Sequence, residues 1–164
     1  MKRRGTILLL VAVACVVVGP LTMAEHKVEE KPNARWEHYT LEFGAGTFAS
    51  FAGGVLSYWL VFSSQARESS LAPMAGFFSI PIGSLIGAST GVIGTNWALG
   101  DEGNVLNVLL TALGAAVGAY AGFYGAIVAP LLPYDSELAM VISTGLATAV
   151  PAALGAVIGY NLGK

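Results

Sequence analysis

The stretches GSLIGASTGVIG, residues 83–94, and GAAVGAYAGFYG, residues 114–125, decide the fold class because both repeat glycine in apolar sequence at intervals of four, four and three residues. The second stretch repeats the glycine positions of the first at a constant offset of 31 residues (83 to 114). Four residues of an α-helix advance only about 40° beyond a full turn, so each glycine row lies on one helix face. The rows are Gly83, Gly87, Gly91 and Gly94, and Gly114, Gly118, Gly122 and Gly125.

A repeated glycine row needs a physical reason, because glycine inside a water-exposed helix costs about 1 kcal/mol relative to alanine. In lipid, every backbone group must be satisfied within the helix, so that cost is more tolerable. Small residues also let helix backbones approach closely, and van der Waals contact is a main source of helix association in membranes. The expected helix-packing residues are Gly46, Gly54, Gly83, Gly87, Gly91, Gly114, Gly118, Gly122, Gly155 and Gly159. The 31-residue offset indicates either a duplicated span or a coincidence of two good packing faces.

The composition is that of a membrane protein. Of the 164 residues, 55% are hydrophobic and 11% are charged, with a net charge of −2. Soluble domains carry about 25% charged residues, so this chain has too little charge to cover a water-facing surface. It also lacks a basic field interleaved with aromatics, which argues against nucleic-acid binding. The single cysteine, Cys15, excludes an intrachain disulfide and a cysteine-based metal cluster.

The N-terminus has the pattern of an export signal. Basic residues at 2–4 precede an apolar run at 7–18, and small residues permit cleavage after Ala24. The apolar run is short for a span, which needs roughly 20 residues. We therefore expect a signal peptide at 1–24 and a polar exported segment at 25–40, with an uncleaved anchor as the alternative.

Charge-free intervals divide the rest of the chain into four potential spans. Each interval can hold an apolar helix of roughly 20 residues, and small residues recur at spacings of three and four rather than alternating as in barrel strands. The predicted fold class is all-α: a four-helix transmembrane bundle with GxxxGxxxG packing faces behind a signal peptide. The membrane domain is expected at 41–163, with spans near 41–62, 72–98, 105–132 and 138–162.

Few residues are candidates for chemistry. Glu42 lies where the first span begins, and an ionisable group inside a membrane is a functional hypothesis by default; its place near the interface would also let the carboxylate reach water. His26 and His38 lack metal-binding spacing, and no catalytic motif or acid–base pair shares a span. We therefore predict no catalytic residue, metal or cofactor, and no enzymatic activity. Asparagines near span ends are expected to hydrogen-bond between helices at about 0.6 kcal/mol each: Asn96, Asn107 and Asn161.

Two classes of function remain. The leading one is a structural or assembly protein whose glycine stripes hold its helices together or dock a partner's helices. The alternative is a small pore or transporter subunit, which needs polar residues stacked along a helix face, whereas the polar residues here gather near the span ends. The expected partners are the lipid bilayer and either a second copy or another membrane protein.

The glycine runs make the chain resemble the glycine-zipper class of small multi-span membrane proteins of the bacterial envelope. Residues 41–163 are also similar in layout to the Tim-type translocase group. These resemblances imply an architecture, with no activity, cofactor or functional residue. The bacterial-type signal favours the inner membrane of the envelope with an external mature N-terminus. The loop that carries Arg67 would then be cytoplasmic, as the positive-inside rule prefers.

Overall fold

Four long helices make up the described part of the chain. The computed structural model describes residues 34–65, 72–101, 103–129 and 135–164. Each helix is long and apolar enough to cross a membrane, so the predicted all-α class with four span-length helices is confirmed. The expected signal peptide lies outside the described residues. The helices are α2 (Ala34–Gln65), α3 (Ala72–Ala98), α4 (Val105–Val128) and α5 (Glu137–Leu162).

The helix bounds differ from the predicted spans at two ends, because hydropathy alone does not determine where a helix begins or ends. Helix α2 begins at Ala34, before the expected span start at 41, because its first turns are polar and hydropathy marks only the apolar length. Helix α4 ends at Val128 rather than near 132. Ala129 has non-helical backbone angles, φ −140° and ψ 79°, and it precedes a proline, which disfavours the helical conformation.

A tight turn joins α3 to α4 and requires glycine at two positions. Gly100 and Gly103 have φ values of +85° and +50°, in the left-handed region that glycine tolerates best. The Asp101 N–H donates to the Asn96 carbonyl over 2.9 Å, a bond of the kind that closes helix C-termini. Asn104 then caps α4, with its side chain accepting from the Asn107 N–H. The turn fixes the spacing and direction of the two helices.

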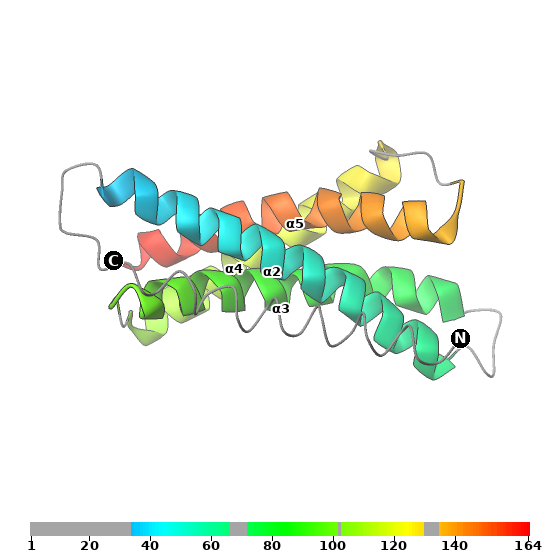
Figure 1. Ribbon diagram of the computed structural model, residues 1–164, viewed down its shortest axis with the longest axis horizontal. Helices are drawn as coiled ribbons and strands as arrows, with labels where there is room; N and C mark the ends of the chain where they lie inside the picture. Colours follow the sequence, from blue (N-terminus) through cyan, green and yellow to red (C-terminus); the bar gives the residue numbers. More distant parts are fainter. Residues whose placement is uncertain (1–33, 66–71, 102, 130–134) are drawn as a thin grey trace.

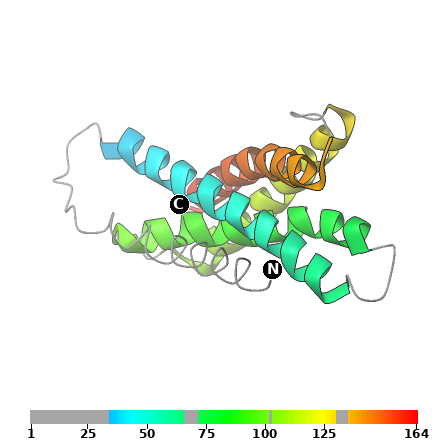
Figure 2. The same ribbon diagram turned by 45° about the vertical axis from the view of Figure 1, so that its right-hand side comes forward.

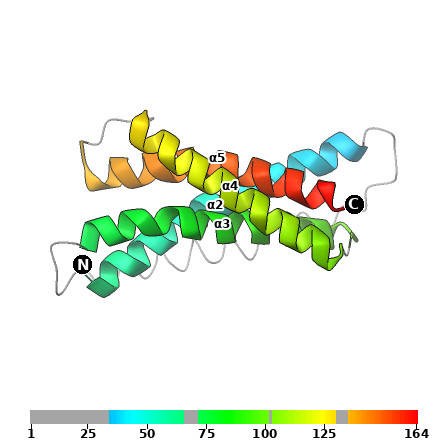
Figure 3. The ribbon, with the colours of Figure 1, turned by 180° about the vertical axis from the view of Figure 1, so that it is seen from behind.

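The helices pack as two antiparallel hairpins. Helix α2 packs against α3 and α4 against α5, while α2–α5, α3–α4 and α3–α5 contacts join the hairpins. Within the described residues α2 and α4 are not neighbours: α2 lies in front in Figure 1 and α4 in front in the reverse view of Figure 3. Figure 2 shows α2 (cyan) crossing in front of α3 (green) and α5 (orange to red). Helices α3 and α5 form the centre: 50% of the apolar part of each is buried, against 28% for α2 and 33% for α4.

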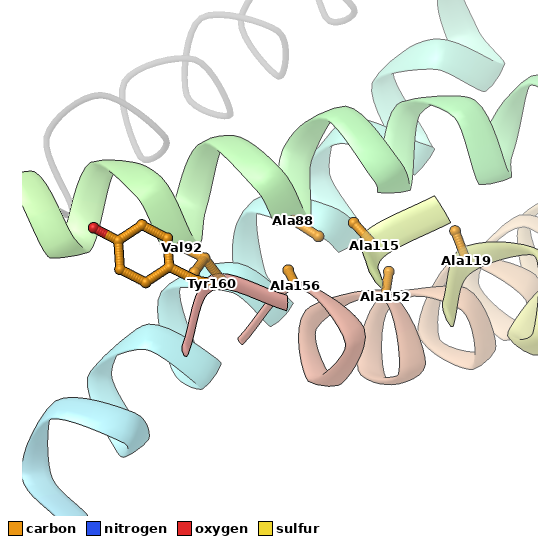
Figure 4. Packing of buried hydrophobic residues seen from close by; sticks show 7 residues of the cluster. All are labelled: Ala88, Val92, Ala115, Ala119, Ala152, Ala156 and Tyr160. Atoms are coloured by element: carbon orange, nitrogen blue, oxygen red, sulfur yellow. The ribbon is translucent and has the colours of Figure 1, made fainter. Parts of the chain in front are cut away.

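The core is built mainly from small side chains, while many large apolar side chains face outward. In Figure 4 the core side chains of α3, α4 and α5 point toward one another. Ile86 on α3 and Val117 on α4 are 58% and 72% exposed. A water-soluble protein rarely exposes such continuous apolar surface, whereas lipid accommodates it, so this distribution suggests contact with a bilayer. The main buried cluster is Ala88, Val92, Ala115, Ala119, Ala152, Ala156 and Tyr160.

Candidate functional site

The main chains of α2 and α3 meet along a row of glycines that we call the α2–α3 seam. A Cβ atom placed on any of three α3 glycines, Gly83, Gly87 and Gly91, would lie closer than 3.0 Å to a carbonyl oxygen of α2. Each step of four residues forward along α3 is matched by a step of four backward along α2. The register is therefore antiparallel and regular. The facing pairs are Gly83 with Gly53, Gly87 with Ala49, and Gly91 with Ala45.

An equivalent α4–α5 seam joins the second hairpin. A Cβ atom on its glycines would again lie closer than 3.0 Å to a carbonyl oxygen of the partner helix. One pair in each seam is reciprocal, because each glycine faces the carbonyl of the other: Gly53 and Gly83 in one, Gly114 and Gly155 in the other. The further pairs are Gly118 with Pro151, Gly122 with Ala147, and Gly159 with Leu110.

The seam geometry directs glycine Cα–H groups at carbonyl oxygens. The Cα hydrogen lies along the direction that a Cβ would take, so each close carbonyl is a candidate acceptor for a Cα–H···O contact. Such contacts contribute perhaps 0.5–1 kcal/mol each in condensed phase. Pro151 lies inside α5 and lacks an N–H, which leaves the Ala147 carbonyl without its helical donor. That carbonyl faces Gly122.

The ten glycines singled out from the sequence fall into two groups. Eight of them have main-chain atoms of a neighbouring helix closer than 3.0 Å to the Cβ position. Gly46 and Gly54 instead face side chains, with Val92 Cγ2 at 2.9 Å and Ser84 Oγ at 2.6 Å from their Cβ positions. The α2 row that meets the α3 main chain is Ala45, Ala49 and Gly53, which sequence reasoning did not select because small residues occupy adjacent positions.

The last glycine of each repeat lies outside the seams. Gly94 and Gly125 have no heavy atom within 4 Å of a Cβ position. Both follow the preceding glycine at a spacing of three, which keeps them on the same side of the helix; their open surroundings therefore mean that the neighbouring helix does not follow the row that far. They provide natural controls, since each shares a helix with seam glycines.

Glu42 belongs to a buried polar cluster at the end where α2 begins and α5 ends. Its side chain is only 1% exposed, although its position in the sequence suggested that the carboxylate could reach water. The Asn161 Nδ2 group donates to Glu42 Oε2 over 2.9 Å, and Asn107 Nδ2 donates to the Tyr160 carbonyl over 2.8 Å. Asn96 donates within its own helix. Two of the three asparagines thus bond between helices, as predicted.

An ion pair at the same end fastens the last residue to the α3–α4 turn. Lys164 Nζ lies 2.6 Å from Asp101 Oδ2 and 5.0 Å from the centre of the Tyr160 ring. The Tyr160 hydroxyl donates to the Asp101 carbonyl over 3.2 Å. The hydrogen bond from Lys164 holds the pKa of Asp101 below its ordinary value, with partial burial opposing it.

This ion pair predicts a small acid sensitivity. A lowered carboxyl pKa stabilises the fold above the ordinary Asp value and is lost as pH falls through the lowered pKa. The Lys164 and Asp101 side chains are 41% and 37% exposed, so the expected contribution is about 0.2–1 kcal/mol. Asp101→Asn should lower the melting temperature slightly at neutral pH and have no effect at strongly acidic pH. In a Lys164→Met background the same substitution should change nothing; an undiminished effect there would contradict the pairing.

Buried hydroxyl groups also meet midway along the bundle. Ser50 Oγ on α2 donates to the Ser84 carbonyl over 2.9 Å, and Ser84 Oγ lies 3.0 Å from Thr148 Oγ1 on α5. The interpretation that the polar residues gather near the span ends is therefore wrong. Serine and threonine hydroxyls can bond to their own helix backbone, so their positions in the sequence did not indicate a contact between helices. On α3, Ala88 and Val92 separate this group from the Glu42 end.

The opposite end of the bundle has its own polar tie between the hairpins. Tyr58 on α2 is fully buried, and its hydroxyl donates to Glu137 Oε1 at the start of α5 over 2.7 Å. The Tyr58 ring stacks on Phe62 with centroids 5.7 Å apart. Helices α2 and α5 are thus linked at both ends through a carboxylate.

No family model, curated protein or solved structure matches the chain. Within residues 34–65, 72–101, 103–129 and 135–164, no three histidine, cysteine or acidic side chains gather as a metal site, and His26 lies outside these ranges. The packing geometry and the polar clusters therefore carry the functional argument.

Proposed function

We propose that this chain is an integral membrane protein of structural or assembly type, held in shape by its two glycine seams. The observation that carries the proposal is the approach of glycines to the main chain of the neighbouring helix along both hairpins. Side chains of ordinary size cannot enter such a contact without moving a backbone. A sequence that keeps these positions free of side chains gains a rigid scaffold rather than a reactive centre.

The seams also bear on how a partner would bind. Eight of the glycines face helices of their own chain, which favours a role in holding this bundle together over one in docking a partner's helices. A partner would then contact the outward apolar surface. A lining of small apolar side chains between the polar groups, at Ala88, Val92, Ala152 and Ala156, gives less support to a pore. The buried cluster of three hydroxyls, on Ser50, Ser84 and Thr148, is the feature that keeps a pore or transporter as the alternative.

Flux measurements distinguish the two functions. We expect liposomes that contain the purified full chain to pass small ions and solutes no faster than empty liposomes. Cross-linking in native membranes followed by mass spectrometry should then recover a second copy or a defined membrane protein. Selective flux that Thr148→Val altered would overturn the structural role and establish the pore.

We further propose that the mature chain starts near Glu25 and lies in the inner membrane of a bacterial envelope, with its N-terminus external. An even number of spans and the meeting of Glu42 with Asn161 at one end support a shared side for both termini. Cysteine labelling in a Cys15→Ser background tests the orientation. The variants are Glu30→Cys, Arg67→Cys, Glu102→Cys and Lys164→Cys. We expect labelling from outside at positions 30, 102 and 164 but not at 67; the reverse pattern would overturn the orientation.

A further inference from the structure

The Glu42 carboxylate is buried, and no ion pair holds it among the residues that the structure describes. It lies about 9 Å along the helix from Trp36, where the span-length part of α2 begins, and its side chain is 1% exposed. In the part of the chain that the structure describes, the one ion pair within 4.0 Å joins Lys164 to Asp101. The bond that Glu42 accepts comes from the neutral amide of Asn161. Among the described residues its negative charge therefore has no ion-pair partner, and Lys164 acts on it only from a greater distance.

An uncompensated buried charge is not stable in a protein interior. Moving an ionised carboxylate out of water costs far more than one hydrogen bond returns, so such a group is paired, holds a cation or becomes neutral. The charged and titratable groups around Glu42 are His38 on its own helix, Tyr160 and Lys164 at the end of α5, and Asp101 in the α3–α4 turn. Lys164 already pairs with Asp101.

We propose that Glu42 is a binding site for one positive charge, supplied as a proton or as a monovalent metal cation, between Asn96 and Asn161. Asn96 and Asn161 face the Glu42 carboxylate from α3 and α5. Their Nδ2 groups donate to the Val92 and Val157 carbonyls of their own helices, and that of Asn161 also donates to Glu42 Oε2; a bound metal cation would use the oxygen of each amide, which can only accept. Carboxylate and amide oxygens are the ligand type that hard cations prefer.

The site lies between the two hairpins. Glu42 belongs to the α2–α3 hairpin and Asn161 to the α4–α5 hairpin, whereas the seams join helices only within each hairpin. Occupation of the site therefore acts on the contact between the hairpins. This inference goes beyond the proposed function and does not depend on the glycines, because it rests on the burial and the partners of one carboxyl group.

Carbodiimide labelling tests the site, since dicyclohexylcarbodiimide enters apolar surroundings and reacts with protonated carboxyl groups. The purified full chain would be treated at a series of pH values with sodium chloride or with choline chloride at equal ionic strength. A proton site predicts modification of Glu42 that falls about tenfold per pH unit above its midpoint, equally in both salts. A sodium site predicts protection by sodium chloride alone. Glu42→Gln should abolish the modification, and Glu137→Gln should retain it.

Thermal melting gives an independent readout if the reagent does not reach the Glu42 carboxyl group. The glutamine amide of Glu42→Gln stands in for the neutralised carboxyl group. We expect wild-type melting to depend on pH or on sodium, and this dependence to disappear in Glu42→Gln while Glu137→Gln retains it. Equal dependence on pH and sodium in wild type and Glu42→Gln, together with no labelling of Glu42 under any condition, would overturn the proposal.

Discussion

Gly118→Ala is expected to destabilise the bundle by about 1–3 kcal/mol, the usual cost of adding volume to a well-packed site. A Cβ at Gly118 would overlap the Pro151 carbonyl oxygen and crowd the Ala152 nitrogen. These atoms are main chain, so no side-chain rotation relieves the contact and the two helices must separate. The measurement is the melting temperature of the full chain in one detergent, and Gly118→Ile should lower it further.

The matched control is Gly125→Ala on the same helix. Nothing lies within 4 Å of its Cβ position, and alanine is favoured over glycine in helices by up to about 1 kcal/mol. Its melting temperature should therefore be unchanged or higher. Gly87→Ala and Gly94→Ala form a second such pair on α3, with the Ala49 carbonyl facing Gly87. If alanine at the seam and control positions had equal effects, the close backbone contact would be disproved.

Gly114→Ala and Gly155→Ala are each expected to destabilise the bundle about as much as Gly118→Ala. Together they should destabilise it by less than the sum of the two single effects. Each Cβ would overlap the carbonyl oxygen of the other glycine. A separation of α4 and α5 that accommodates one methyl group at this point also makes room for the second. Residues in contact commonly show interaction energies of about 0.5–3 kcal/mol. The double variant should therefore be clearly more stable than the sum of the two single destabilisations predicts.

A pair on different seams supplies the reference for this cycle. Gly87 and Gly114 belong to separate hairpins, and Gly87 faces Ala49 rather than α4. The effects of Gly87→Ala and Gly114→Ala should therefore add. Full additivity of Gly114→Ala with Gly155→Ala would show that the two glycines do not share one contact.

The class of the fold follows from sequence because its signals are local. Four charge-free intervals and glycines at intervals of four predict apolar helices, and four such helices are present. The spacing also indicates which face of α3 or α4 is smooth. It does not reveal how close the neighbour comes. From spacing alone, alanine is expected to be mild at a glycine row, whereas the carbonyl of Ala49 opposite Gly87 makes even a methyl group costly.

Other parts of the site depend on tertiary contacts that leave no local pattern. On α2, small residues occupy positions 45, 46, 49, 50, 53 and 54, so two adjacent rows are equally smooth and only the crossing of the helices selects one. The burial of Glu42 depends on Asn161, which lies 119 residues away in sequence. Ser84 and Thr148 likewise meet across 64 residues. Neither pairing follows from spacing within one helix.

Solid-state NMR of the full chain in lipid bilayers tests the glycine seams most directly. Proline labelled at the carbonyl carbon and glycine labelled at Cα would report the contact of Pro151 with Gly118. The account predicts magnetisation transfer between these two carbons, as strong as the transfer between Pro81 and Gly83, which are neighbours on one helix. Transfer from Pro81 to Gly83 without any transfer from Pro151 to Gly118 would contradict it.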